Sequence, residues 1–93
     1  MKINIHKTKQ LGQMVKFARQ VQGLDQASAG MLSGNGSTFM SEFENGKPTV
    51  QLARVLNTME SLGITITIDL PVKDASLTPK QRERLALILS EFE

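Results

Sequence analysis

The stretch LDQASAGMLSGNGSTFMSEFENGKPT, residues 24–49, decides the fold of this 93-residue chain. Asp25 suits the N-cap of a short helix expected over residues 26–33, because its carboxylate can accept free backbone N–H groups and faces the positive end of the helix dipole. Gly-Asn-Gly at residues 34–36 predicts a tight turn, since these residue types tolerate positive φ. A second short helix is expected over about residues 36–46. Two short helices joined by a tight turn predict a helix-turn-helix.

Two further helices are expected on either side of this stretch, over residues 8–22 and 50–62, because apolar residues recur there at helical spacing. Glu44 is expected to bond locally at the end of the third helix. The residues expected to pack inside the four helices are Leu11, Met14, Val15, Ala18, Val21, Ala29, Gly30, Leu32, Phe39, Met40, Phe43, Leu52, Val55, Leu56, Met59 and Leu62.

The apolar period changes from helical to two after residue 63, which predicts a β-strand over residues 64–70 with one apolar face. A single strand cannot satisfy its own backbone groups. We therefore expect this strand to pair with the same strand of a second copy across a two-fold axis, so that the chain forms a homodimer. The residues expected at this dimer interface are Ile64, Ile66, Ile68 and Leu70.

Residues 71–77 are expected to form a linker, and residues 78–93 an amphipathic helix. Thr78-Pro79-Lys80-Gln81 has the form of a capping box with proline at the first helical position. A helix of this length is marginal in isolation, so we expect it to be ordered when its apolar face docks on another surface. The residues of that face are Leu85, Ile88, Leu89 and Phe92.

Composition narrows the possible functions. No cysteine is present, which excludes disulfides and thiolate metal sites, and no apolar run is long enough to cross a bilayer, so a cytoplasmic location without membrane contact is expected. No nucleophile, base or metal cluster is visible, so we expect neither an enzyme nor a cofactor.

Residues 1–47 carry six Lys/Arg against three acidic residues, and the remainder carries five against six. A basic front half can face phosphates, and an ordinary solvated surface explains it equally well.

The expected third helix begins with small polar side chains that suit contact with DNA. Ser37, Thr38 and Ser41 can donate to or accept from base edges and phosphates, and the threonine methyl can contact a thymine methyl. Small residues also let the helix backbone approach the base edges in the major groove. Gln26, at the start of the preceding helix, can bond a phosphate beside the free N–H groups there. These residue types predict a DNA-binding helix-turn-helix.

The residues Leu24-Asp25-Gln26, then Gly34, then SEFENGKPT at residues 41–49 resemble the Cro/C1-type (Xre-like) helix-turn-helix family, over about residues 10–63. Within that family the chain is most similar to the HipB-type antitoxins. The resemblance implies a mostly α, lambda-repressor-like helix-turn-helix bundle of four to five helices, with one C-terminal β-strand pairing across a dimer.

The resemblance also implies function and partners. HipB-type proteins are dimeric repressors that bind double-stranded operator DNA, autoregulate their operon and hold a HipA-like serine/threonine kinase toxin. By position, Gln26 would contact the DNA backbone and Lys47 a phosphate. The candidate DNA-binding residues are Gln26, Asn35, Gly36, Ser37, Thr38, Ser41 and Lys47.

The chain departs from its relatives at residues 33 and 35–38. Relatives often carry Arg, Lys or Gln where this chain has Gly36, Ser37 and Thr38, and apolar residues where it has Ser33 and Asn35. Two other hypotheses stay open: a free-standing Xre-like regulator without a toxin, and a protein-interaction adapter whose helix-turn-helix no longer binds DNA. The weak charge of the expected third helix keeps the adapter open. The expected organisation is a DNA-binding domain over residues 1–63, a dimerisation strand over 64–70, a linker over 71–77 and a helix over 78–93.

Overall fold

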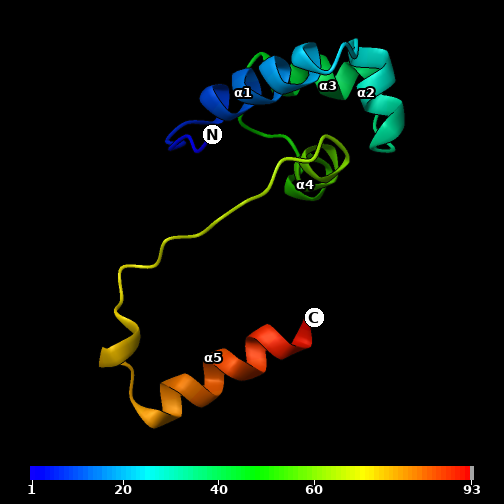
Figure 1. Ribbon diagram of the computed structural model, residues 1–93. Helices are drawn as coiled ribbons and strands as arrows, with labels where there is room; N and C mark the ends of the chain where they lie inside the picture. The colour runs from blue at the N-terminus through cyan, green and yellow to red at the C-terminus, as the bar shows by residue number, and fades with distance from the viewer. Residues whose placement is uncertain (93) are drawn as a thin grey trace.

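The computed structural model describes residues 1–92, so Glu93, the last residue of the helix expected over residues 78–93, lies outside the described residues. Within that range the helices are α1 (Thr8–Val21), α2 (Gln26–Leu32), α3 (Ser37–Glu44), α4 (Leu52–Ser61) and α5 (Pro79–Glu91), with a short 3-10 turn η1 (Asp74–Ser76). The first four helices pack into one bundle, and α5 stands apart from it at the end of an extended segment (Figure 1). No helix among residues 1–92 combines the length and apolar character needed to cross a membrane.

Each of the four bundle helices contributes to one core, which confirms the four-helix prediction. Phe39 and Phe43, on α3, stack with their ring centroids 5.8 Å apart. Around them the buried apolar residues are Val15, Ala29, Met40, Val55, Met59 and Leu62. Asp25 caps α2 as expected, because its carboxylate accepts a hydrogen bond from the backbone N–H of Ser28 at 2.7 Å. That bond also lowers the pKa of Asp25.

Four residues that were expected inside are exposed: Val21, Leu32, Leu52 and Leu56. Val21 and Leu32 are the last residues of α1 and α2. Leu52 and Leu56 lie one turn apart on α4, beside the buried face that carries Val55. These predictions were wrong because short helices have apolar faces that are wider than the arc a four-helix bundle covers.

Gly12 brings α1 into direct contact with the end of α3. A Cβ atom at Gly12 would lie 2.1 Å from the carbonyl oxygen of Phe43, so no other residue type fits without moving one of the two helices. Beside this crossing, the side-chain amide of Gln13 donates to the carbonyl oxygen of Glu44 at 2.6 Å. The backbone of α3 is therefore fixed against the backbone of α1.

A buried ion pair joins three of the helices. Arg19 of α1 donates to both carboxylate oxygens of Glu44 at the end of α3, with distances of 2.6 and 2.7 Å. Gln26 of α2 donates its amide to the same carboxylate at 3.0 Å, and Arg19 also donates to the carbonyl oxygen of Leu24 at 3.1 Å. The prediction that Glu44 bonds locally was wrong, because its carboxylate points into the bundle toward a residue 25 positions earlier.

The pair shifts the titration of both partners. Burial by itself raises the pKa of Glu44, but the hydrogen bonds from Arg19 and Gln26 and the nearby positive charges lower it below its usual value. The hydrogen bond to Glu44 raises the pKa of Arg19, against the opposing effect of burial. Both groups are therefore held in their charged forms.

A second polar cluster joins α2 to α4. The side-chain amide of Asn35, in the turn between α2 and α3, donates to the carbonyl oxygen of Arg54 at 3.1 Å and to the hydroxyl of Thr58 at 3.0 Å. The same amide lies 3.2 Å from the hydroxyl of Ser33. Thr58 is completely buried, so the hydrogen bond from Asn35 satisfies a polar group inside the bundle.

Residues 64–70 form no strand in the single chain. They run as an extended segment in which Ile64 packs against the core while Ile66, Ile68 and Leu70 are exposed. Among the described residues no strand lies beside this segment, so its backbone groups lack the partner that a β-strand requires. The expected linker contains η1, and the expected capping box at Thr78 and Gln81 is confirmed.

Replacement of Glu44 by Ala is expected to lower the free energy of unfolding by about 3–5 kcal/mol, because Arg19 would remain buried without its counter-charge. Denaturant unfolding at a fixed protein concentration measures this change. The matched control is Glu42→Ala on the same helix. That change breaks only the half-exposed Glu42–Lys47 pair, and its expected cost is below about 1 kcal/mol. Equal losses in the two variants would contradict the role given to the buried pair.

Candidate nucleic-acid interface

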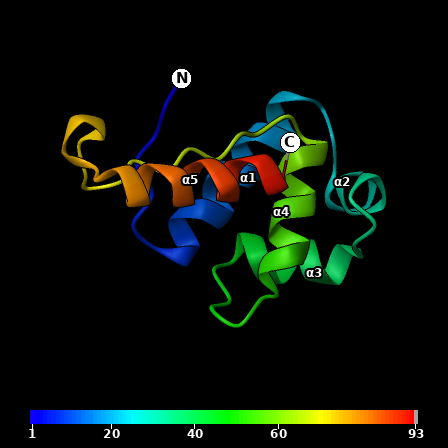
Figure 2. The same ribbon diagram turned by 90° about the horizontal axis from the view of Figure 1, so that it is seen from below.

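The helix-turn-helix is formed by α2, α3 and the turn between them. Gly34 has φ +74°, which only glycine adopts without strain, and the backbone N–H of Asn35 donates back to the carbonyl oxygen of Gly30 at 2.7 Å. The chain therefore reverses sharply between the helices. Figure 2 shows α2 nearly end-on while α3 is seen from the side, so the two helices are steeply inclined.

The first turn of α3 lies open to solvent. Gly36, Ser37 and Thr38 are exposed, and Ser41, one turn later, is half-buried. The N-cap is Gly36, which has no side chain, so no side-chain hydrogen bond caps the helix. Free backbone N–H groups and small hydroxyls therefore occur together at one end of α3. Groups of these two kinds contact phosphates and base edges in protein–DNA complexes.

Basic side chains lie beside this turn. An open hollow of about 380 Å³ is lined by Thr38 of α3, by Lys47 of the following loop and by Gln51 and Arg54 around the start of α4. Lys47 pairs with Glu42 at 2.8 Å, and both side chains are nearly half exposed. The structure thus places Lys47 and Thr38 on the same hollow. It adds Arg54, which sequence reasoning missed because only the packing of α4 against the turn places it there.

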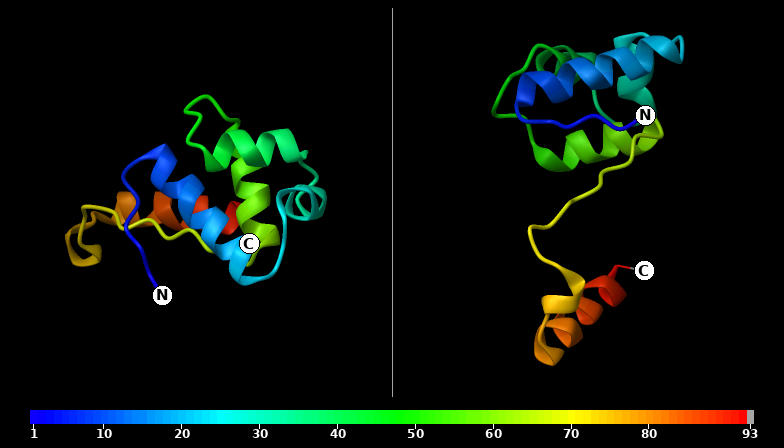
Figure 3. Two further views of the ribbon diagram at one scale, coloured as in Figure 1. Left: turned by 90° about the horizontal axis from the view of Figure 1, so that it is seen from above. Right: turned by 60° about the vertical axis from the view of Figure 1, so that its left-hand side comes forward.

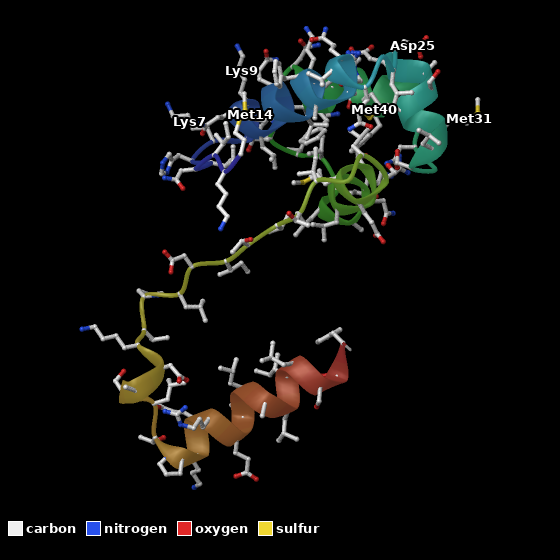
Figure 4. The ribbon with its side chains drawn as sticks, in the orientation of Figure 1. Lys7, Lys9, Met14, Asp25, Met31 and Met40 are labelled. Carbon is white, nitrogen blue, oxygen red and sulfur yellow. The ribbon has the colours of Figure 1, made fainter. Side chains whose placement is uncertain are left out.

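A further cation lies on the other side of the loop. A Cβ atom at Gly46 would meet the side chain of Lys9 at 2.7 Å, which puts the start of α1 next to the residue before Lys47. Lys7 and Lys9 project from this end of α1, while Asp25 lies at the far end of the bundle (Figure 4). The lysines at residues 7 and 9 were visible in the sequence as charges, but their spacing did not indicate where they would lie.

Two of the predicted DNA-binding residues have structural partners. Gln26 is half-buried and its amide nitrogen is bonded to Glu44, so it helps to orient α3 from the start of α2. Asn35 is also half-buried and its amide is bonded to α4. The exposed part of the predicted set is therefore Gly36, Ser37, Thr38 and Lys47, with Ser41 at its edge. No group of three or more potential metal ligands occurs in the described part of the chain.

Comparison with known proteins places this geometry in a family. No protein-family profile matches the chain. An uncharacterized HTH-type transcriptional regulator, y4mF, from Sinorhizobium fredii is 36% identical over 61 residues, which are 66% of this chain and 80% of that protein. Two solved structures share the fold. One is named MDT Protein, with a TM-score of 0.69, 24% identity and coverage of 76% of this chain and 100% of that one.

The second solved structure is a complex of a HipB variant with an O2 20mer, with a TM-score of 0.70 and 25% identity. The match covers 77% of this chain and 100% of the HipB chain. The helix-turn-helix geometry, the curated relative and the HipB-like fold agree. The chain belongs to the Xre-like, Cro/C1-type family of helix-turn-helix transcriptional regulators.

Proposed function

We propose that this protein is a sequence-specific DNA-binding repressor whose α3 enters the major groove of operator DNA. The observation that carries this proposal is the open first turn of α3, where uncapped backbone N–H groups and small hydroxyls lie next to Lys47 and Arg54. The solved complex of a HipB variant with the O2 20mer has the same fold and supports the proposal.

The contacts divide by chemistry. Ser37, Thr38 and Ser41 lie on the side of α3 that would face base edges, and Gly36 allows the backbone to come close. Lys47 and Arg54 would meet phosphates on one side of the groove, which sets affinity and makes it depend on salt. Few side chains here are long enough to bond two base atoms at once. Sequence preference is therefore expected to rest partly on DNA shape and ordered water.

We further propose that two copies bind the operator together. In a dimer, residues 64–70 of both chains would pair as antiparallel strands, which gives their backbone groups partners and removes the exposed apolar face of Ile66, Ile68 and Leu70 from water. The two α3 helices would then contact half-sites about 34 Å apart, one turn of DNA.

The likeness to HipB supports a role as an antitoxin that represses its own operon and binds a HipA-like kinase. The full-length chain, purified from its native host, is expected to carry with it a serine/threonine kinase encoded by a neighbouring gene. Mass spectrometry of the purified complex identifies the kinase. Addition of the operator DNA shows whether the complex binds it. A chain that binds its own upstream DNA and has no kinase neighbour would instead be a free-standing Xre-like regulator.

Thr38→Ala is expected to change base preference at one operator position, while Lys47→Ala should weaken binding to all sequences alike and reduce the salt slope by about one. Selection from random duplexes, followed by fluorescence anisotropy at several salt concentrations, measures both effects. Asn35→Ala is the control: it should lower stability and leave base preference unchanged, because the Asn35 side chain faces α4. The same loss pattern for Thr38→Ala and Lys47→Ala would show that these roles are wrongly assigned.

Truncation separates the strand from the rest of the C-terminal segment. A chain that ends at Gly63 is expected to be monomeric and to lose most operator affinity, because its two half-site contacts are no longer joined. A chain that ends at Leu70 keeps the strand and should still dimerise and bind. Analytical ultracentrifugation and anisotropy measure the two properties. Full dimerisation and affinity in the shorter chain would exclude the strand as the dimer interface.

A further inference from the structure

Among residues 1–92, the apolar stripe of α5 lies apart from the four-helix bundle (Figure 1). Ile88 and Phe92 are 46% and 81% exposed, and Leu85 is half-buried. The helix is well formed: it begins with a complete capping box and proline, and Arg82 ties it to η1 through Asp74 at 2.9 Å. The right-hand view of Figure 3 shows it away from the bundle, at the end of the extended segment. About a quarter of the chain has no counterpart in the two solved structures, although each of those is matched over its whole length.

We propose that α5 pairs with α5 of a second copy as a short antiparallel two-helix coil. This inference rests on the proposed homodimer, because it shares the two-fold axis of the strand pair. Gln81, Leu85, Ile88 and Phe92 follow one another at spacings of four, three and four residues, which is the spacing of the seam positions of a coiled coil.

One register brings the seam residues of two antiparallel helices together. Leu85 of each helix would lie against Ile88 of the other, and Phe92 of each would cover the first turn of the other near Gln81. The two apolar layers at the centre are then identical by symmetry. Two apolar layers contribute little stability, so other interactions must favour the antiparallel arrangement over the parallel one.

Charge makes that selection. The first half of α5 carries Lys80, Arg82 and Arg84 against one acid, Glu83, and its last turn carries Glu91. In the antiparallel register, Arg84 of each helix would flank the seam beside Glu91 of the other, which gives two symmetric ion pairs. Among residues 1–92 no ion pair involves Arg84 or Glu91. A parallel arrangement would place the two basic halves together and align the helix dipoles in the same direction.

The path of the chain is compatible with a shared axis. Figures 1 and 2 both show α5 running back along the direction of the extended segment. From the middle of residues 64–70 to residue 72 the chain moves away by about 16 Å, and from residue 79 to the middle of the seam α5 returns by about 11 Å. The two displacements are opposite in direction and differ by about 5 Å.

Spin labels on the full-length dimer test the arrangement. The chain has no cysteine, so Lys80→Cys and Ser90→Cys each give one labelling site per chain on the outer side of the helix. The register predicts Cα separations of about 22 Å between the two copies of residue 80 and about 14 Å between those of residue 90. A parallel pair would give about 10 Å at both sites.

Charge reversal tests the proposed ion pairs. Arg84→Glu should weaken dimerisation of the full-length chain about tenfold, and Glu91→Arg added to it should restore dimerisation to within about threefold. The matched control is Lys80→Glu, which makes the same change in charge at an outward position and should have little effect. Analytical ultracentrifugation measures the dissociation constants.

The outcomes separate this inference from the proposed function. A longer distance at residue 80 than at residue 90, with rescue by the double variant, supports the antiparallel pair. A broad distance distribution in a dimer that still binds operator DNA would overturn the pair and leave the proposed function standing. Equal short distances at residues 80 and 90 would mean a parallel pair. If α5 is protected from hydrogen exchange in the monomer, and the protection does not depend on protein concentration, α5 docks on its own bundle. Both results would also overturn the inference.

Discussion

The buried contact between Arg19 and Glu44 fixes the relation of α3 to the rest of the bundle. It joins the last part of α1 to the end of α3, and Gln26 extends it to the start of α2. A charged pair in the core is not a large source of stability, since desolvation offsets most of the attraction. Its geometry is specific, however, because a guanidinium bonds a carboxylate in few orientations. The pair therefore mainly determines how the two helices of the helix-turn-helix sit on α1.

The Asn35 cluster supports the other side of the same unit. It joins the turn between α2 and α3 to the backbone of α4, so the turn is held by directional bonds. The side chains of Ser33, Asn35 and Thr58 are bonded to one another, which accounts for the two polar residues at positions 33 and 35. α3 is thus supported at its end by an ion pair and at its start by an amide.

Local features could be predicted from the sequence, and tertiary ones could not. The Asp25 cap, the turn at Gly34 and the capping box of α5 each depend on residues within a few positions of one another, and all three are present. The partner of Glu44 is 25 residues away, and no spacing rule indicates it. Ser37, Thr38 and Lys47 were named from the helix-turn-helix resemblance and not from periodicity, and their contact with DNA stays a prediction.

The contact at Gly12 fixes the distance between α1 and α3, and so the position of α3 relative to the rest of the bundle. Backbone meets backbone there, so no side chain can rearrange to absorb a change in helix separation. The surface that α3 presents at its open first turn is continuous with this rigid crossing through only two turns of helix. Buried residues at the crossing of α1 and α3 thereby determine how far the first turn of α3 protrudes from the bundle.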